Sequence, residues 1–159
     1  MSNVNQNMRA IRAYKTLCAA LDDRQWKYRK NEDDLIVTLN FSTDSLPVEF
    51  FIKVVAERQL VQLLSRLPLT FPEDKRVEGS LATLAASYSL VDGSFDYDLS
   101  DGKVTFRNVV AFHNSELSKA VVDHMVDCAY AIITNYNEKL FAVSKGYLPV
   151  QDFMKEAYE

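Results

Sequence analysis

His124 and Cys128 are the clearest pair in this sequence whose types and spacing could do chemistry. They lie four residues apart in a segment with helical periodicity, and residues four apart share one face of an α-helix. A thiol beside an imidazole can form a nucleophile–base dyad or supply two ligands of a zinc site. Asp123 and Asp127 flank the pair, so both kinds of chemistry are open to it.

The rest of the sequence does little to complete such a site. The other cysteine and histidine, Cys18 and His113, have no motif spacing relative to the pair. Cys128 also continues an apolar stripe made of Leu117, Val121, Met125 and Ile132. We therefore interpret Cys128 as a packed thiol beside a boundary histidine. We expect no catalytic residue, no metal ligand, no cofactor and no enzymatic activity.

An alternative from a different class keeps chemistry possible. It is a small-molecule-binding or catalytic domain that uses a pocket lined by Trp26, Tyr28 and neighbouring aromatics, or the His124/Cys128 pair. The reactivity of the Cys128 thiol separates the two interpretations. A fast thiol with a low pKa favours chemistry, and an inert thiol favours packing.

Composition indicates one ordinary globular domain. The 159 residues are 48% hydrophobic, which suits a single core, and we predict one domain over 1–159 with a short C-terminal helical extension over 144–159. Residues 1–7 are polar, unlike a signal peptide, and no stretch approaches the roughly 20 apolar residues of a membrane helix. We therefore expect a cytoplasmic protein without a membrane partner.

Charge is unevenly distributed along the chain. Residues 1–30 hold seven basic and two acidic side chains, a charge of +5, so the total of −4 leaves −9 for residues 31–159. The basic residues of the first predicted helix are spaced as on a solvated helix face, and an acidic chain is a poor candidate for binding nucleic acid. We expect no nucleic-acid partner.

The elements that must position these residues follow from apolar periodicity. We predict helices from a cap at Asn7 to about Asp22, between Pro72 and Gly93, from a cap at Asn114 or Ser115 towards Val143, and after Pro149. We predict strands over 26–29, 35–42, 47–55, 94–99 and 103–112. Residues 57–67 fit either type, and the nearby Pro68 and Pro72 favour a strand. The predicted fold is α+β, with an antiparallel sheet of about five or six strands flanked by helices.

Three stretches carry a family resemblance. They are Glu57 to Leu69, Pro72 to Arg76, and Gly93 to Gly102. With the order of elements, they resemble the YbjN-like domain family, which is similar in fold to the type III secretion (Tir-type) chaperones. The resemblance implies a tendency to dimerise and a protein-binding or regulatory role without known catalysis. It supplies no functional residues.

The helix predicted between Pro72 and Gly93 has more apolar surface than one core face needs. No charged residue occurs from Ser80 to Val91. We assign the core face to Val77, Leu81, Leu84, Tyr88 and Val91. The opposite face is small and nearly apolar, which suits the close approach of another helix, and it consists of Gly79, Ala82, Thr83, Ala86, Ser89 and Leu90.

This second face predicts an interface. Its partner could be the C-terminal part of the same chain or the same helix of a second subunit. The family resemblance favours the helix of a second subunit as the partner, because many secretion chaperones dimerise through the corresponding helix. We therefore expect a homodimeric, non-enzymatic protein–protein interaction domain, chaperone-like or regulatory, that holds a segment of an unidentified protein partner.

Overall fold

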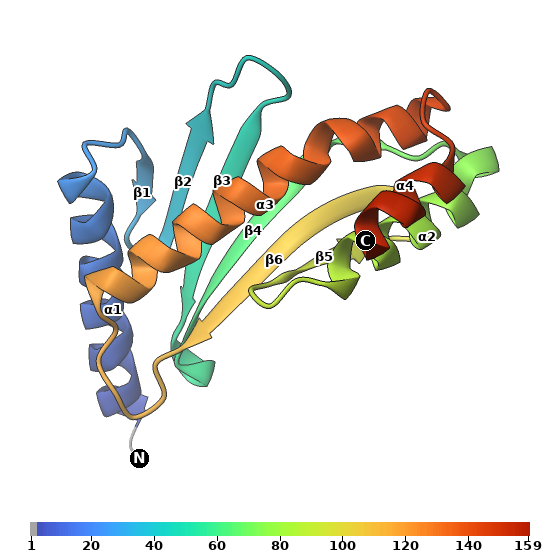
Figure 1. Ribbon diagram of the computed structural model, residues 1–159. Coiled ribbons are helices and arrows are strands. Elements are labelled where there is room, and N and C mark those ends of the chain that lie inside the picture. Colours follow the sequence, from blue (N-terminus) through green and yellow to red (C-terminus); the bar gives the residue numbers. More distant parts are fainter. Residues whose placement is uncertain (1–2) are drawn as a thin grey trace.

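An antiparallel sheet of six strands forms the middle of the molecule in the computed structural model, which describes residues 3–159 (Figure 1). The strands are β1 (Arg29–Asn31), β2 (Ile36–Phe41), β3 (Val48–Val55), β4 (Leu60–Thr70), β5 (Ser94–Tyr97) and β6 (Lys103–Ala111). Their order is β1-β2-β3-β4-β6-β5, and all neighbours are antiparallel. The predicted fold class is confirmed.

Strand β4 begins within the ambiguous segment 57–67, as predicted, and continues to Thr70. A short 3-10 helix, η1 (Ala56–Arg58), precedes it. Alternate residues of β4 are buried, including Val61 and Leu63, which is the pattern of a strand with one face in the core. The pairing of β4 with β6 shifts register between Arg66 and Thr70. Pro68 lies within this shift. Proline has no N–H to donate to the ladder of hydrogen bonds, so an irregularity in the pairing is expected there.

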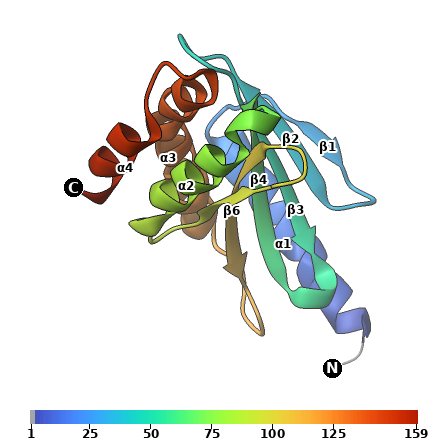
Figure 2. The ribbon, with the colours of Figure 1, turned by 90° about the vertical axis from the view of Figure 1, so that its right-hand side faces the viewer.

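Four α-helices cover one face of this sheet (Figures 1 and 2). They are α1 (Asn3–Asp23), α2 (Arg76–Tyr88), α3 (Lys119–Lys145) and α4 (Val150–Tyr158), and a 3-10 turn η2 (Glu73–Lys75) leads into α2. Helix α3 crosses the sheet diagonally, between α1 at the β1 end and α2 with α4 at the β5 end (Figure 1). One hydrophobic core runs from Ala10 in α1 to Phe153 in α4.

Local sequence signals set most of the helix ends. Gly146 ends α3 with a positive φ of 76°, and Pro149 precedes α4, both as predicted. The predicted start of α3 was wrong: Ser118, rather than Asn114 or Ser115, is the N-cap, and its side chain accepts a hydrogen bond from the Val121 N–H. Helix α1 begins before Asn7, so that residue does not cap it.

The two faces of the sheet differ in what covers them. On the buried face, Val37, Ile52, Leu63 and Asn108 are cross-strand neighbours beneath the helices. On the opposite face, which we call the open sheet face, the corresponding row is Thr38, Phe51, Leu64 and Arg107, and its side chains are half-buried or exposed. Within the described part of the chain, all four α-helices lie on the buried face, so the open sheet face is accessible from solvent.

Within residues 3–159, none of the helices combines the length and the hydropathy that crossing a membrane requires.

Candidate protein-binding surface

Helix α2 presents a continuous stripe of large apolar side chains to solvent. The stripe, which we call the α2 outer face, consists of Val77, Leu81, Leu84, Tyr88 and the adjoining Val91, with exposed fractions of 71%, 39%, 66%, 75% and 94%. Steps of three and four residues align these side chains along one side of the helix. Single exposed apolar residues are ordinary, but a contiguous apolar patch on a folded chain marks an interaction site.

The predicted assignment of the two faces of this helix was therefore wrong. The residues expected in the core are the exposed ones. Of the predicted dimer interface, Gly79, Ala82, Thr83 and Ala86 are buried inside the chain, Leu90 is half-buried and Ser89 is exposed. In this conformation the four buried residues are not accessible to a second subunit. Dimerisation through α2 stays a prediction, and the surface available for it is the α2 outer face.

The size of the side chains explains the reversal. At Gly79 an added Cβ would lie 2.6 Å from a ring carbon of Phe71 and 2.5 Å from the hydroxyl of Tyr97. The Tyr97 hydroxyl also donates a hydrogen bond to the Arg76 carbonyl at 3.0 Å, which holds α2 at this distance. Thr83 satisfies its buried hydroxyl within the helix by donating to the Gly79 carbonyl. Only a face of small residues fits so close to the sheet.

Helix α4 borders the α2 outer face. The rings of Tyr88 and Tyr158 meet edge to face with centroids 5.1 Å apart, and Tyr158 is 48% exposed. Val150 and Phe153 anchor α4 in the core. The apolar surface therefore extends from α2 onto the end of α4, two elements that lie side by side in both views (Figures 1 and 2).

A groove of about 510 Å³ hollows the open sheet face at its β5 end. Gln62, Leu64, Arg66, Asp98 and Thr105 are among the residues that line it. Apolar, basic and acidic side chains alternate here without forming a metal or phosphate cradle. The groove suits a polypeptide, whose backbone and side chains offer the same mixture of groups.

The two edges of the sheet differ in whether their outward backbone groups already have hydrogen-bond partners. At the β5 edge, the Ser87 hydroxyl accepts a hydrogen bond from the Phe95 N–H at 2.8 Å and donates one to the Phe95 carbonyl at 3.3 Å, which blocks strand addition. At the other edge, β1 pairs with β2 only from Ile36 to Thr38. Within the described chain, the rest of β2, through Asn40 to Phe41, has no strand on its outer side. Such an edge is a ready template for another strand.

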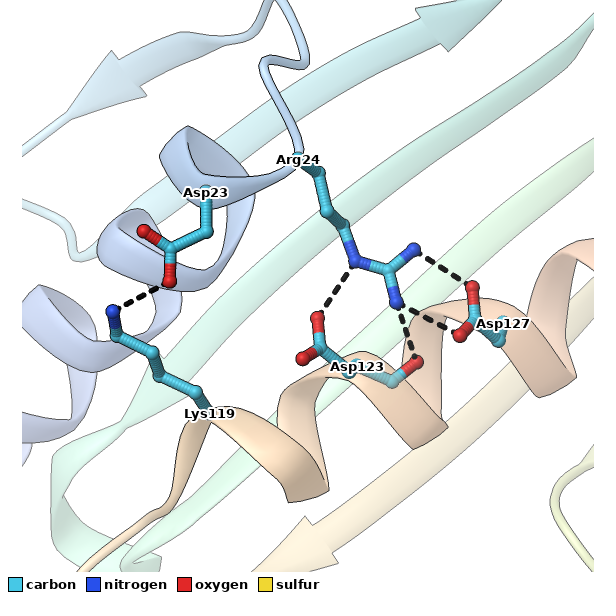
Figure 3. A network of polar contacts seen from close by, with 5 residues as sticks. All are labelled: Asp23, Arg24, Lys119, Asp123 and Asp127. Atoms are coloured by element: carbon cyan, nitrogen blue, oxygen red, sulfur yellow. Dashed lines mark hydrogen bonds and ion pairs between the residues drawn. The ribbon is translucent and has the colours of Figure 1, made fainter.

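A charged network joins α1 to α3 (Figure 3). The Arg24 guanidinium donates to Asp123 at 2.7 Å and to both carboxylate oxygens of Asp127 at 2.7 and 2.8 Å, and Lys119 pairs with Asp23 at 2.6 Å (Figure 3). These hydrogen bonds from Arg24 hold the pKa of the Asp127 carboxyl below its usual value. Asp123 and Asp127, which flank the His124/Cys128 pair in the sequence, therefore bind Arg24.

The structure brings a different carboxylate to that pair. Asp92, in the loop between α2 and β5, lies 3.3 Å from His124 Nε2 and 3.8 Å from Cys128 Sγ. Cys128 is half-buried at the surface of α3 rather than packed in the core. Burial and the nearby Asp92 carboxylate raise the pKa of the Cys128 thiol. A thiol with a raised pKa is a poor nucleophile at neutral pH, which argues against the dyad.

The aromatic pair Trp26 and Tyr28 is packed rather than open. The Trp26 ring meets Phe41 edge to face with centroids 4.9 Å apart, and the Arg24 guanidinium stacks over it at 4.7 Å. The Tyr28 hydroxyl donates to Asp22 at 2.7 Å. Both residues are half-buried and pack against the core.

Comparison with known families agrees with the fold. The profile of the YbjN family, described as "Putative bacterial sensory transduction regulator", matches residues 13–142. The chain belongs to the YbjN family. The match spans all six strands, the second half of α1 and most of α3, so this YbjN-family chain carries the family's pattern through its whole sheet. No curated protein sequence matches the chain.

Solved structures with the same fold are distant in sequence. A chain of the ExsC–ExsE complex is 15% identical with a TM-score of 0.59, and the match covers 80% of this chain and 92% of that one. A chain of the HopA1–SchA chaperone–effector complex is 13% identical with a TM-score of 0.54, covering 82% and 97%. YbjN from E. coli is 12% identical with a TM-score of 0.59, covering 81% and 94%. The YbjN-family chain therefore shares its fold with a chain of the ExsC–ExsE complex, a chain of the HopA1–SchA chaperone–effector complex and YbjN from E. coli.

Proposed function

We propose that this chain is a non-enzymatic, chaperone-like or regulatory protein that forms a homodimer and holds a segment of another protein. The α2 outer face carries the proposal. Five large apolar side chains on one uncharged stripe expose a surface whose burial is favourable by roughly 25 cal/mol for each Å² removed from water. A charge-free patch with no protein over it is costly for a chain that stays alone in water.

A second copy of the chain is the occupant we propose for this face. The stripe is one helix surface of repeated apolar residues, which is self-complementary when two copies meet about a two-fold axis. Tyr88 and Tyr158 supply aromatic groups, the type of residue that most often dominates interface energetics. The family resemblance to chaperones that dimerise through the corresponding helix supports the same choice.

The substitution Leu84→Glu tests this part of the proposal. Leu84 is 66% exposed, so the change adds two carboxylates to a symmetric dimer without disturbing the core of either chain. We expect the dimer dissociation constant to rise by about 100-fold or more. Gel filtration with light scattering would report the change as loss of the dimer peak.

The matched control is Met8→Glu. Met8 is 53% exposed on α1, far from α2 along the sheet, and receives the same new side chain (Figure 1). We expect this variant to keep the dimer. Loss of the dimer in both variants, or in neither, would contradict the assignment of the interface to the α2 outer face.

The partner segment is proposed to bind at the open edge of β2 and across the open sheet face. Backbone groups of β2 beyond Thr38 can pair with one extended part of the segment, and the groove around Leu64 can receive another part of it, farther across the sheet. Two of the structures with this fold are complexes of two different proteins, which supports a protein ligand here.

Photo-crosslinking tests the partner site. A photoreactive residue placed at Asn40, exposed on the free part of β2, should give a discrete crosslinked product with a protein from the source cell. The same residue placed at Glu73, exposed in the turn before α2, should not give that product. Equal crosslinking from both positions would mean that the β2 edge is not the binding site.

The proposal includes a cytoplasmic location and a mode of action by binding, without covalent catalysis. Both cysteines are free thiols, which suits the reducing cytoplasm where we place the protein. The raised pKa of Cys128 suits a chain that acts by binding rather than by covalent catalysis. Slow alkylation of Cys128 at neutral pH, compared with a free thiol in solution, is the expected result. Fast alkylation would favour catalysis instead.

A further inference from the structure

Asp92, His124 and Cys128 bring three different metal-binding groups together at one point on the surface. Asp92 comes from the loop after α2, and the other two lie one turn apart on α3. Their donor atoms all lie within 4.8 Å of one another. The sequence indicated only two of these donors, because Asp92 is more than thirty positions away from the pair.

The distances among the donors match one face of a zinc coordination tetrahedron. With bonds of about 2.3 Å to sulfur and about 2.0 Å to nitrogen or oxygen, tetrahedral ligands lie about 3.5 Å apart when one is sulfur and about 3.3 Å apart otherwise. The observed separations are 3.5 Å for Cys128 Sγ to His124 Nε2, 3.8 Å for Cys128 Sγ to Asp92 Oδ2, and 3.3 Å for His124 Nε2 to Asp92 Oδ2. The three separations are within a few tenths of an ångström of the tetrahedral values.

We propose that Asp92, His124 and Cys128 form a zinc site with three protein ligands and a fourth position open to water. The donor set selects the metal. A thiolate with an imidazole suits zinc and disfavours magnesium and calcium, which prefer oxygen ligands alone. Three protein ligands with a free fourth position are the arrangement in which zinc remains accessible.

Zinc binding requires one rotation and releases one proton. Cys128 Sγ is nearly equidistant from the two imidazole nitrogens, at 3.7 and 3.5 Å, so it faces the ring instead of lying along a nitrogen lone pair. The His124 side chain is 64% exposed and can turn to direct Nε2 at the ion. As the Zn–S bond forms, the S–H bond breaks and its proton passes to solvent.

The site would clip the loop after α2 to helix α3. Val91, the last residue of the α2 outer face, immediately precedes Asp92 and is 94% exposed. An ion held by Asp92 and by α3 would restrict this loop and stabilise the folded chain by an amount that rises with the free zinc concentration. The site does not require the proposed dimer, since all three ligands come from one chain.

Cobalt substitution and zinc titration of the full chain test the proposal. After removal of metal with a chelator, Co²⁺ should bind one ion per chain with a thiolate-to-cobalt charge-transfer band and tetrahedral visible spectrum. Zn²⁺ should displace it and raise the melting temperature. Cys128→Ser should abolish the band, and His124→Ala and Asp92→Asn should each weaken Zn²⁺ binding by roughly tenfold or more.

Matched controls use the same residue types outside the site. Cys18 is buried in α1, while His113 and Asp33 are exposed and remote from the cluster. Cys18→Ala should keep the band, and His113→Ala and Asp33→Asn should bind Zn²⁺ as the original chain does. Either of two results would overturn the proposal: no Zn²⁺ binding by the folded chain, or a charge-transfer band that survives Cys128→Ser. The three side chains would then form hydrogen bonds only.

Discussion

The two faces of helix α2 are both nearly free of charge, yet one is buried and the other is exposed. The inner face of small residues, such as Gly79 and Ala86, lies against the aromatic side chains of the sheet. The outer face of large residues, such as Leu84 and Tyr88, meets solvent. The comparison teaches that the space available beneath a helix, as well as hydrophobicity, decides which face turns inward. The face left outside is then available to a partner.

The substitution Gly79→Val should have the largest effect because it breaks the inner face directly. A Cβ at this position would lie 2.6 and 2.8 Å from two ring carbons of Phe71, which is fully buried and has no room to move. We expect a loss of about 3 kcal/mol or more in the free energy of unfolding, from overpacking and a β-branched side chain in a helix. Urea unfolding measures it.

Ser80→Val is the control for this prediction. Ser80 is the next residue along α2, and its hydroxyl bonds only to the Val77 carbonyl of the same helix. The same new side chain should change the free energy of unfolding by about 0.5 kcal/mol or less. Equal losses at residues 79 and 80 would show that α2 does not pack against the sheet through its small face.

Removal of Arg24 should reduce the free energy of unfolding by less than Gly79→Val does. Arg24 joins α1 to α3 through ion pairs, whereas α2 packs on the sheet through apolar contacts. The Arg24 side chain is 22% exposed between Asp123 and Asp127, whose side chains are 42% and 63% exposed. Solvent therefore screens the network, and Arg24→Met should cost about 1 kcal/mol at neutral pH. The exposed pair of Arg12 and Glu116 provides the control, since Arg12→Met should cost almost nothing.

The contribution of this network should depend on pH in a defined direction. Arg24 lowers the folded-state pKa of Asp127, so its stabilisation is fully present above the ordinary carboxyl pKa of about 3.9. The stabilisation is lost as the pH falls through the lowered folded-state pKa. The difference between the original chain and Arg24→Met should therefore shrink as the pH falls below about 3.9 in unfolding measurements. A difference that stays constant would mean that Arg24 acts through packing on Trp26 alone.

Much of this fold could be predicted from the sequence because its signals are local. Alternating apolar residues marked β3, Gly146 marked the end of α3, and Pro149 marked the start of α4. For β4 the apolar pattern fitted a helix equally well, and the nearby Pro68 and Pro72 favoured the strand. The correct face of α2 could not be read in this way. Its periodicity fits two faces equally well, and the choice depends on Phe71 and Tyr97, which reach Gly79 from other elements.

The candidate sites were predictable only in part for the same reason. The absence of charge from Ser80 to Val91 indicated surplus apolar surface on α2, although the wrong side of the helix was assigned to it. The difference in side-chain size between the two faces of α2 could have indicated that the face of small residues packs on the sheet. His124 and Cys128 were visible as a pair through their spacing of four residues. Asp92 carried no signal, since a loop residue reaches α3 only through the tertiary fold.

A predicted effect of the same size as that of Arg24→Met concerns the contact between helix α2 and strand β5. Ser87→Ala removes the hydroxyl that occupies both backbone groups of Phe95 and should cost about 1 kcal/mol. Hydrogen exchange should show faster exchange of the Phe95 amide. Ser89→Ala, at an exposed position after α2, should leave that amide unchanged. Unchanged exchange in both variants would mean that Ser87 does not protect the β5 edge.

Sedimentation equilibrium of the unmodified chain over a range of concentrations tests the central claim most directly. If the α2 outer face is covered by a second copy, the mass should approach twice the 18.1 kDa of one chain as concentration rises. The mass should fall back towards one chain on dilution, with a single dimer dissociation constant. A mass of 18.1 kDa at every concentration would contradict the account, because the exposed stripe on α2 would then have no copy of the chain to bind.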